Sequence, residues 1–204
     1  PELYEAWGTP EFDELYEKYE RATSIPKTKI SARDLFTDLL KERAETGRIY
    51  IMNIDHANSH SSFKDRVSMS NLCQEITLPT TPKQDIHDEQ GEIALCILSA
   101  VNVGALNDLS ELENICDLSV RALEQIFDYQ DYPVRAAEVS TKNRRSLGIG
   151  YIGLAHYLAK NNVKYSDPKA WELVDRLSEA FQYHLLRASC NIAVSYTHLT
   201  LPTI

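Results

Sequence analysis

Three side chains that can do chemistry alternate along one short stretch, residues 70–80 (Ser-Asn-Leu-Cys-Gln-Glu-Ile-Thr-Leu-Pro-Thr). If the stretch is extended, Asn71, Cys73 and Glu75 share one face, because side chains two apart in a strand point the same way. An amide, a thiol and a carboxylate would then follow one another at about 7 Å. On this pattern alone the simpler interpretation is a half-buried strand, since a free cysteine is commonly a small buried hydrophobe.

The other cysteines are Cys96, Cys116 and Cys190. The four cysteines form no C-x-x-C pair, and no histidine lies at a zinc-ligand spacing from them, so we expect reduced, catalytic or buried thiols rather than structural disulfides. Cys96 lies in the apolar run 93–104, which is typical of a strand buried on both faces. We interpret Cys116 and Cys190 as packing residues of helices, and by itself Cys96 also fits the core.

Composition excludes some classes of function. The chain has 204 residues and a net charge of −9, which argues against a broad nucleic-acid surface. It contains no apolar run of the roughly 18 to 20 residues that a membrane span needs. Because no basic and then apolar signal segment is present, we expect a cytoplasmic protein. The chain begins at Pro1 rather than at a methionine, so we also expect a piece of a longer protein.

The elements that would position these residues alternate between helix and strand. Apolar spacing and capping residues predict five helices: one within 1–30 before a turn at 24–26, one from Ser31 to Gly47 with Ser31 and Asp34 as a capping box, one from Ser110 with Glu113 as its capping box, one over 151–160 and one from about Ser166. Alternation predicts a strand over 48–55, and a helix followed by a glycine and a strand is typical of an α/β fold. No internal repeat or domain boundary is evident.

Two further patterns have an ordinary interpretation. His56 and His60 could suggest a metal site, but residues 56–62 lack helical spacing and are predicted to form a solvated loop. Gly148, Gly150 and Gly153 match the glycine spacing of a dinucleotide-binding turn only weakly. A strand-to-helix turn with closely packed backbone explains these glycines equally well.

Residues 70–80 resemble the active-site loop of the large, catalytic subunit of class I ribonucleotide reductase. Further segments resemble the same family in the same order: 46–51, 91–96, 128–133, 144–150 and 157–160. The resemblance covers about positions 10 to 193. It implies an α/β fold that is part of a ten-stranded α/β barrel, incomplete in this chain, with residues 70–80 as a finger loop at its centre.

The same resemblance sets the expected boundaries. Residues 1–194 are expected to be a fragment of the catalytic barrel domain. Residues 195–204 do not continue the family pattern, and we expect them to be a chimeric or poorly ordered tail. Within the barrel, Gly148 to Gly153 would be a strand-to-helix connection and not a nicotinamide site.

The resemblance also implies a chemistry, the reduction of ribonucleoside diphosphates to 2′-deoxyribonucleoside diphosphates for DNA synthesis. Cys73 would be the thiyl radical that abstracts the 3′-hydrogen, Glu75 the general base for the 3′-hydroxyl and Asn71 the residue that holds the ribose hydroxyls. Cys96 would be one of two cysteines that become a disulfide. The implied substrate-binding residues are Asn71, Leu72, Cys73, Gln74, Glu75 and Leu98.

Partners and effectors follow from the family as well. The resemblance implies ATP and deoxynucleoside triphosphate effectors, a small subunit with a di-iron tyrosyl radical, thioredoxin or glutaredoxin as reductant, and a homodimer of the large subunit. We expect this fragment itself to bind no cofactor, metal, nucleic acid or membrane. The ATP-cone, specificity loops, first cysteine of the redox pair, relay tyrosines, carboxy-terminal cysteine pair and phosphate-binding loop are not recognisable here, so we expect no turnover by the isolated chain.

Two alternatives remain open at this point. One is a non-catalytic α/β fragment whose cysteines only pack. The other is a cobalamin-dependent relative, whose loop usually has Pro-Cys-Gly where this chain has Leu72-Cys73-Gln74. That difference favours class I.

Overall fold

The computed structural model describes residues 2–83 and 85–199. The chain divides into two compact units, Pro1–Thr81 and Pro82–Ile204. This division differs from the sequence-based expectation of no internal boundary, and Pro79 and Pro82 lie beside it. None of the described helices is long and apolar enough to cross a membrane.

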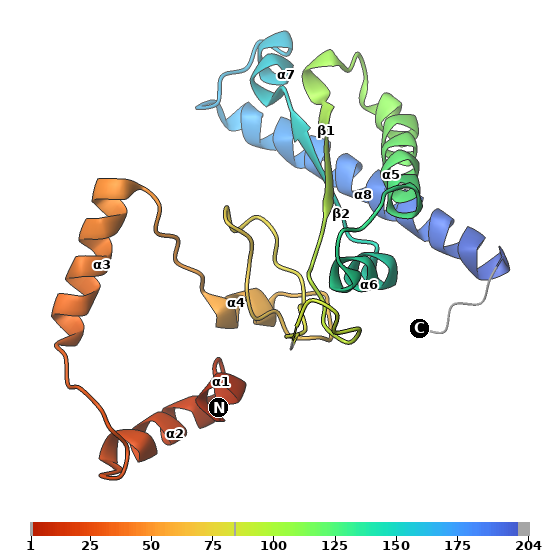
Figure 1. Ribbon diagram of the computed structural model, residues 1–204. Helices are drawn as coiled ribbons and strands as arrows, with labels where there is room; N and C mark the ends of the chain where they lie inside the picture. Colours follow the sequence, from red (N-terminus) through yellow and green to blue (C-terminus); the bar gives the residue numbers. More distant parts are fainter. Residues whose placement is uncertain (1, 84, 200–204) are drawn as a thin grey trace. The chain divides into compact units, whose positions relative to one another are not determined.

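The described residues of the amino-terminal unit form four helices, α1 (Glu2–Ala6), α2 (Pro10–Arg21), α3 (Ala32–Thr46) and α4 (Ile54–Ser59) (Figure 1). The predicted helix after Ser31 is confirmed as α3. The Ser31 hydroxyl accepts the N–H of Asp34 at 3.3 Å, and Gly47 ends the helix with a left-handed φ of 65°. These are the local signals that start and stop a helix, so its limits could be read from the sequence.

The predicted strand over 48–55 is wrong. Residues 48–53 are irregular, and α4 starts at Ile54. Alternation gives a chain two faces, but a strand also needs a hydrogen-bonded neighbour. The strands among the described residues lie in the other unit, so this segment has no partner there.

The predicted polar loop over 56–62 is wrong in its first half, because α4 extends to Ser59. The Asn58 side chain donates to the Ile54 carbonyl at 2.8 Å and supports that short helix. Nδ1 of His60 lies 3.0 Å from the carbonyl of His56, so this ring bonds within its own turn. Within residues 2–83 and 85–199, no group of three or more His, Cys, Asp or Glu side chains could hold a metal ion.

The carboxy-terminal unit is built on two parallel strands, β1 (Ile97–Asn102) and β2 (Leu147–Ile152). Two short 3₁₀ helices, η1 (Val103–Ala105) and η2 (Leu109–Glu111), and then helices α5 (Leu112–Tyr129) and α6 (Arg135–Arg144) connect them. Parallel strands require such a crossover. The register pairs Leu98 with Gly148 and Ala100 with Gly150. The α/β class is therefore confirmed at the level of this small sheet.

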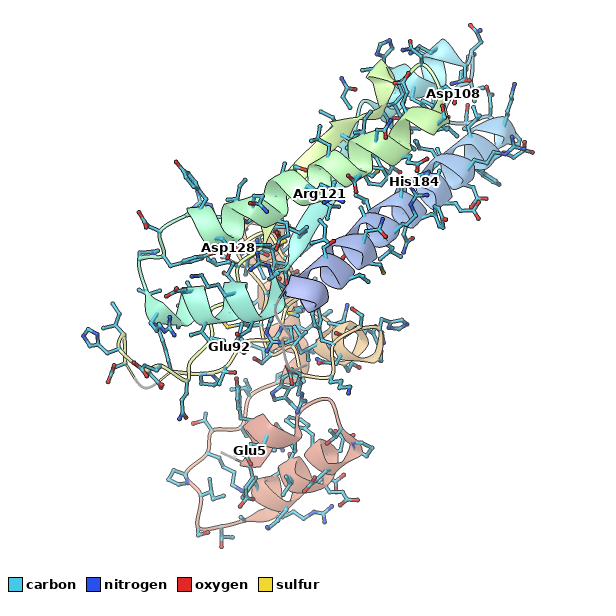
Figure 2. The ribbon with its side chains drawn as sticks, turned by 90° about the vertical axis from the view of Figure 1, so that its right-hand side faces the viewer. Glu5, Glu92, Asp108, Arg121, Asp128 and His184 are labelled. Atoms are coloured by element: carbon cyan, nitrogen blue, oxygen red, sulfur yellow. The ribbon has the colours of Figure 1, made fainter. Side chains whose placement is uncertain are left out.

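β1 differs from its prediction in length and burial. It is shorter than the apolar run 93–104, and it is buried on one face rather than two. On the buried face, Val101 and partner side chains of β2 pack against α5 and against α8 (Pro168–Leu199). Figure 2 shows α5 and α8 running along each other beside the strands. The opposite face has no such cover within the described unit.

The core joins both strands to both long helices. Val101, Cys116 of α5 and Phe181 of α8 belong to one apolar cluster, against which Tyr151 packs. The rings of Tyr151 and Phe181 meet edge to face, with their centres 5.5 Å apart. Burying each large apolar side chain stabilises the fold by roughly 1.5–3 kcal/mol. Cys116 is fully buried, and burial raises the pKa of its thiol to about 11. Its predicted role in packing is confirmed.

Two helix starts lie elsewhere than predicted. Asp108, not Ser110, caps the turn that leads into α5: its carboxylate accepts the Ser110 N–H at 2.8 Å (Figure 2). The helix proper then begins at Leu112, so the predicted capping box at Ser110 is wrong. The helix predicted over 151–160 is α7 (Leu154–Lys160), because β2 occupies residues 151 and 152.

The last helix is confirmed with Pro168 in its first turn, and its apolar side buries Leu177, Phe181 and Ala188. Cys190 of this helix is exposed, so its predicted packing role is wrong in this unit. The backbone of α8 extends to Leu199. The expected tail at 195–204 falls partly on residues 200–204, which lie outside the described residues.

A half-buried cation joins α5 to the start of β2. Arg145 follows α6 with a left-handed φ of 46°, and its guanidinium pairs with Glu124, which is 5% exposed, and with Asp128 at 2.8 Å. Burial lowers the pKa of Arg145, but the two carboxylates outweigh burial and leave that pKa raised. The hydrogen bond from Arg145 is the main cause that lowers the pKa of Asp128 (labelled in Figure 2).

Replacing Arg145 by Ala is expected to lower the free energy of unfolding by about 3 kcal/mol, because Glu124 would stay buried without this cation. Arg121→Ala is the matched control. Arg121 pairs with Asp117 at 2.7 Å, and both side chains are exposed on α5, the helix that also carries Glu124. An exposed pair of this kind contributes little to stability, because water screens both charges. Urea unfolding followed by circular dichroism measures both variants, and equal losses would contradict the account.

Candidate functional site

Residues 71–74 form a tight turn rather than a strand. The Gln74 N–H donates to the Asn71 carbonyl at 3.1 Å, and Gln74 has a φ of 61°. Left-handed backbone ends the alternation that an extended segment would keep. The predicted row of Asn71, Cys73 and Glu75 on one strand face is therefore wrong, because the segment is a loop and not a strand.

Side chains close this loop on itself. Oδ1 of Asn71 accepts the Ile76 N–H at 3.0 Å, and the Ser70 hydroxyl donates to the Ile76 carbonyl at 2.7 Å. Farther from the turn, the hydroxyl oxygens of Ser68 and Thr80 lie 3.3 Å apart and join the two arms of the loop. The amide oxygen of Asn71 thus shapes the turn, and its Nδ2 is the group that can donate to a ligand.

The turn presents reactive side chains on the surface of the amino-terminal unit. Cys73 and Glu75 are exposed, and Leu72 is 83% exposed. Gln74 is half-buried beside them. A thiol and a carboxylate within one turn can act on neighbouring atoms of one small molecule.

The base of the loop is anchored by residues that the sequence analysis did not single out. Asn58 donates to the Val67 carbonyl and accepts the Val67 N–H, both at 2.8 Å, and Val67 is fully buried. The Arg66 guanidinium lies 3.5 Å from the centre of the Trp7 ring and donates to the Glu5 carbonyl at 2.9 Å. Asn58 was read only as part of a polar loop, and nothing local marks Arg66 as an anchor.

The remaining predicted site residues, Cys96 and Leu98, lie in the carboxy-terminal unit. Cys96 directly precedes β1 and is half-buried, and burial raises the pKa of its thiol. Leu98 is 56% exposed on the uncovered face of the sheet. A cysteine with a raised pKa stays protonated near neutral pH, so Cys96 is a thiol that can give up hydrogen rather than a ready nucleophile.

An ion pair and two backbone bonds hold the segment that leads to Cys96. Arg144 of α6 pairs with Glu92 at 2.8 Å, with side chains 16% and 12% exposed (Glu92 is labelled in Figure 2). The Ile93 N–H donates to the Ala136 carbonyl at 3.1 Å, and the Ile97 N–H to the Ser146 carbonyl at 3.4 Å. In the sequence, Glu92 and Arg144 stand out only as members of longer segments that resemble the family. The sequence signals for this ion pair were an acidic residue shortly before a predicted strand and an arginine at the end of a helix.

The glycine pattern at 148–153 is confirmed as a strand-to-helix connection. Gly148 and Gly150 lie within β2, and Gly153 starts α7 with a φ of 80°. A dinucleotide-binding turn would place its glycines in the loop after the strand. The predicted site residues therefore form two sets, 71–75 in one unit and Cys96 with Leu98 in the other, and their joint action stays a prediction.

Replacing Asn71 by Leu is expected to speed amide hydrogen exchange of Ile76 about tenfold, because the N–H loses its acceptor. Asn71→Asp keeps an oxygen at that position and should leave exchange near the original rate. The Val67 amide, held by Asn58, is the internal control. Equal exchange in both variants would contradict the role of Asn71 in closing the loop.

The chain is similar to proteins of one family along almost all of its length. The family model described as "Ribonucleotide reductase, barrel domain" matches residues 1–200. The ribonucleoside-diphosphate reductase subunit alpha of Buchnera aphidicola subsp. Schizaphis graminum is 53% identical over 198 residues, 95% of this chain and 26% of that protein. The Haemophilus influenzae subunit is 55% identical and the Escherichia coli reductase 1 subunit alpha 52%, with the same coverage.

A solved structure agrees with the sequence relatives. The Actinobacillus ureae class Id ribonucleotide reductase alpha subunit matches with a TM-score of 0.61 and 25% identity, over 89% of this chain and 34% of that one. This chain spans about a quarter of the length of the curated relatives it matches. With the family model matched over residues 1–200, the chain belongs to the ribonucleotide reductase barrel-domain family.

Proposed function

We propose that this chain carries part of the substrate site of a ribonucleoside-diphosphate reductase alpha subunit, which reduces ribonucleoside diphosphates to 2′-deoxyribonucleoside diphosphates for DNA synthesis. One observation carries the proposal: a self-closed loop presents Cys73 and Glu75 at its exposed turn, in a chain whose family match runs through the loop. The non-catalytic alternative gives no reason to expose a thiol and a carboxylate together.

Each loop residue has a role in this proposal. Cys73, as a thiyl radical, takes the 3′-hydrogen of the ribose and returns it at the end, so it is not consumed. Glu75 accepts the proton of the 3′-hydroxyl, which requires the carboxylate within hydrogen-bond reach of that group. Asn71 donates from Nδ2 to the ribose hydroxyls, because its Oδ1 already accepts the Ile76 N–H. Leu72, Gln74 and Leu98 line the substrate.

The reducing equivalents come from two thiols. The bond between C2′ and its hydroxyl breaks, the hydroxyl leaves as water, and a hydrogen takes its place. Two thiols supply two electrons and two protons and become one disulfide, and Cys96 is one of them. Its raised pKa suits this role, because the sulfur keeps its hydrogen until the substrate needs it.

The proposal extends to the whole enzyme. A radical would be quenched in open water, so we propose that this chain is part of a ten-stranded α/β barrel that encloses the loop in the whole subunit. A small subunit with a di-iron tyrosyl radical would supply the oxidising equivalent for Cys73. Thioredoxin or glutaredoxin would reduce the disulfide in the cytoplasm, ATP and deoxynucleoside triphosphates would act as effectors, and the alpha subunit would form a homodimer. The relatives' name, subunit alpha, supports an enzyme of several subunits.

In the full-length subunit, Cys73→Ser and Cys96→Ser are each expected to lower deoxycytidine diphosphate formation by about a thousandfold or more, as loss of a reacting group does. The assay contains the small subunit and a protein dithiol as reductant. Cys190→Ser is the control, since this thiol is exposed on α8 and should leave activity unchanged. Retained activity in Cys73→Ser would exclude the radical role. The 204-residue chain alone is expected to form no product.

A further inference from the structure

The uncovered face of the two-stranded sheet carries both predicted site residues of the carboxy-terminal unit. Side chains two apart along a strand share a face, so Cys96 and Leu98 point the same way, away from Val101 and the core. The register places Gly148 of β2 directly opposite Leu98. This face thus brings the thiol, the leucine and the glycine together.

Because Gly148 has no side chain, the side chains of Cys96 and Leu98 can occupy the space beside it. A Cβ added at Gly148 would lie 2.4 Å from Cδ2 of Leu98 and 3.1 Å from Sγ of Cys96. Two carbon atoms at 2.4 Å overlap, and the contact with sulfur is also tighter than ordinary van der Waals contact. Any side chain at 148 would therefore displace Leu98 and press on the Cys96 sulfur.

Backbone conformation does not explain this glycine. The glycines with positive φ are Gly8, Gly47 and Gly153, and Gly148 is not among them. A glycine inside a strand weakens it, so the position calls for a reason in its surroundings. The close neighbours Cys96 and Leu98 supply that reason.

Gly150 provides a matched comparison two residues along the same strand. It lies on the same face, opposite Ala100, and its φ is not positive either. A Cβ there would meet nothing within 4 Å among the described residues. Changing either glycine to alanine adds the same methyl group, but only at 148 does that group meet Cys96 and Leu98.

We propose that Gly148 is a positioning residue for ribonucleotide reduction, because the space left by its missing side chain sets where the Cys96 sulfur and the Leu98 side chain lie. The proposal rests on the proposed function of Cys96 as a redox thiol. It adds a residue to the site that acts through Cys96 and Leu98 and does not itself touch the reacting atoms. Leu98 is exposed and can rotate away, so alanine at 148 should change the site without unfolding the sheet.

The first test measures the Cys96 thiol without catalysis. In the full-length subunit, iodoacetamide alkylation of Cys96 is followed by peptide mass spectrometry, with exposed Cys190 as the internal reference. Gly148→Ala is expected to slow Cys96 alkylation about three- to tenfold, as an off-rotamer, more crowded side chain would. Gly150→Ala should leave the Cys96 rate unchanged. Equal rates in the two variants would overturn the proposal.

A second variant separates positioning from simple damage to the fold. Leu98→Ala removes the atom that the new methyl group meets most closely, so Gly148→Ala in that background should unfold at the same temperature as Leu98→Ala alone. Cys96 should still alkylate slowly in the double variant, because the contact with its sulfur remains. Recovery of the full rate would show that Cys96 is not positioned by Gly148.

Activity distinguishes failure of this proposal from failure of the proposed function. Gly148→Ala is expected to lower kcat about tenfold or more, since a small displacement of a reacting group costs that much. If Cys96→Ser reduces nucleotides normally, the proposed function of Cys96 fails, whatever the alkylation rates. If Cys96→Ser is inactive while Gly148→Ala matches the original enzyme in kcat and alkylation, only the positioning role fails.

Discussion

The parallel pairing of β1 with β2 is the constraint on which the carboxy-terminal unit depends. In this register Val101 faces α5 and α8, while Cys96 and Leu98 face the other way with Gly148 between them. A slip of one residue would turn Val101 outward and Cys96 into the core, because side chains alternate along a strand. The same ladder therefore builds the core and orients the residues proposed to act on the substrate.

The loop that carries Cys73 is held by local hydrogen bonds rather than by strand pairing. Its turn is held by short-range bonds, from Gln74 to Asn71 and from Ile76 to Asn71, and not by a sheet. Such a loop can keep its form while presenting its turn to a ligand. Cys96, in contrast, is placed by contacts distant in sequence, including the pair of Glu92 and Arg144. A loop held by local hydrogen bonds and a thiol held by tertiary contacts are consistent with the proposed roles, in which the Cys73 sulfur is recycled and the Cys96 sulfur is consumed.

The sequence predicted best what is decided locally. Ser31 and Gly47 mark both ends of α3, and the apolar stripe of α5 correctly placed Cys116 in the core. Alternation misled at 48–55, where the segment has no strand beside it in the described unit. The alternating pattern also gave a wrong prediction at Gln74, because glutamine is not a residue type that indicates a positive φ. Cys190 was misread because helical spacing alone does not say which flank of a long helix is covered.

The site shows the same limit. The types and spacing of Asn71, Cys73 and Glu75 suggested reactive chemistry, but their separate roles came from the family resemblance. Gly148 was noticed for a dinucleotide pattern, whereas its significance lies in two neighbours about 50 residues away in the chain, which only the strand register reveals.

In the proposed reaction Cys73 is recycled, while Cys96 is consumed. Its most direct test is one turnover by the prereduced full-length enzyme without external reductant, followed by acid quenching and mapping of every cysteine by peptide mass spectrometry. Cys96 is expected to be recovered in a disulfide in proportion to the deoxynucleotide formed, while Cys73, Cys116 and Cys190 remain thiols. Deoxynucleotide formed with Cys96 still a thiol would contradict it.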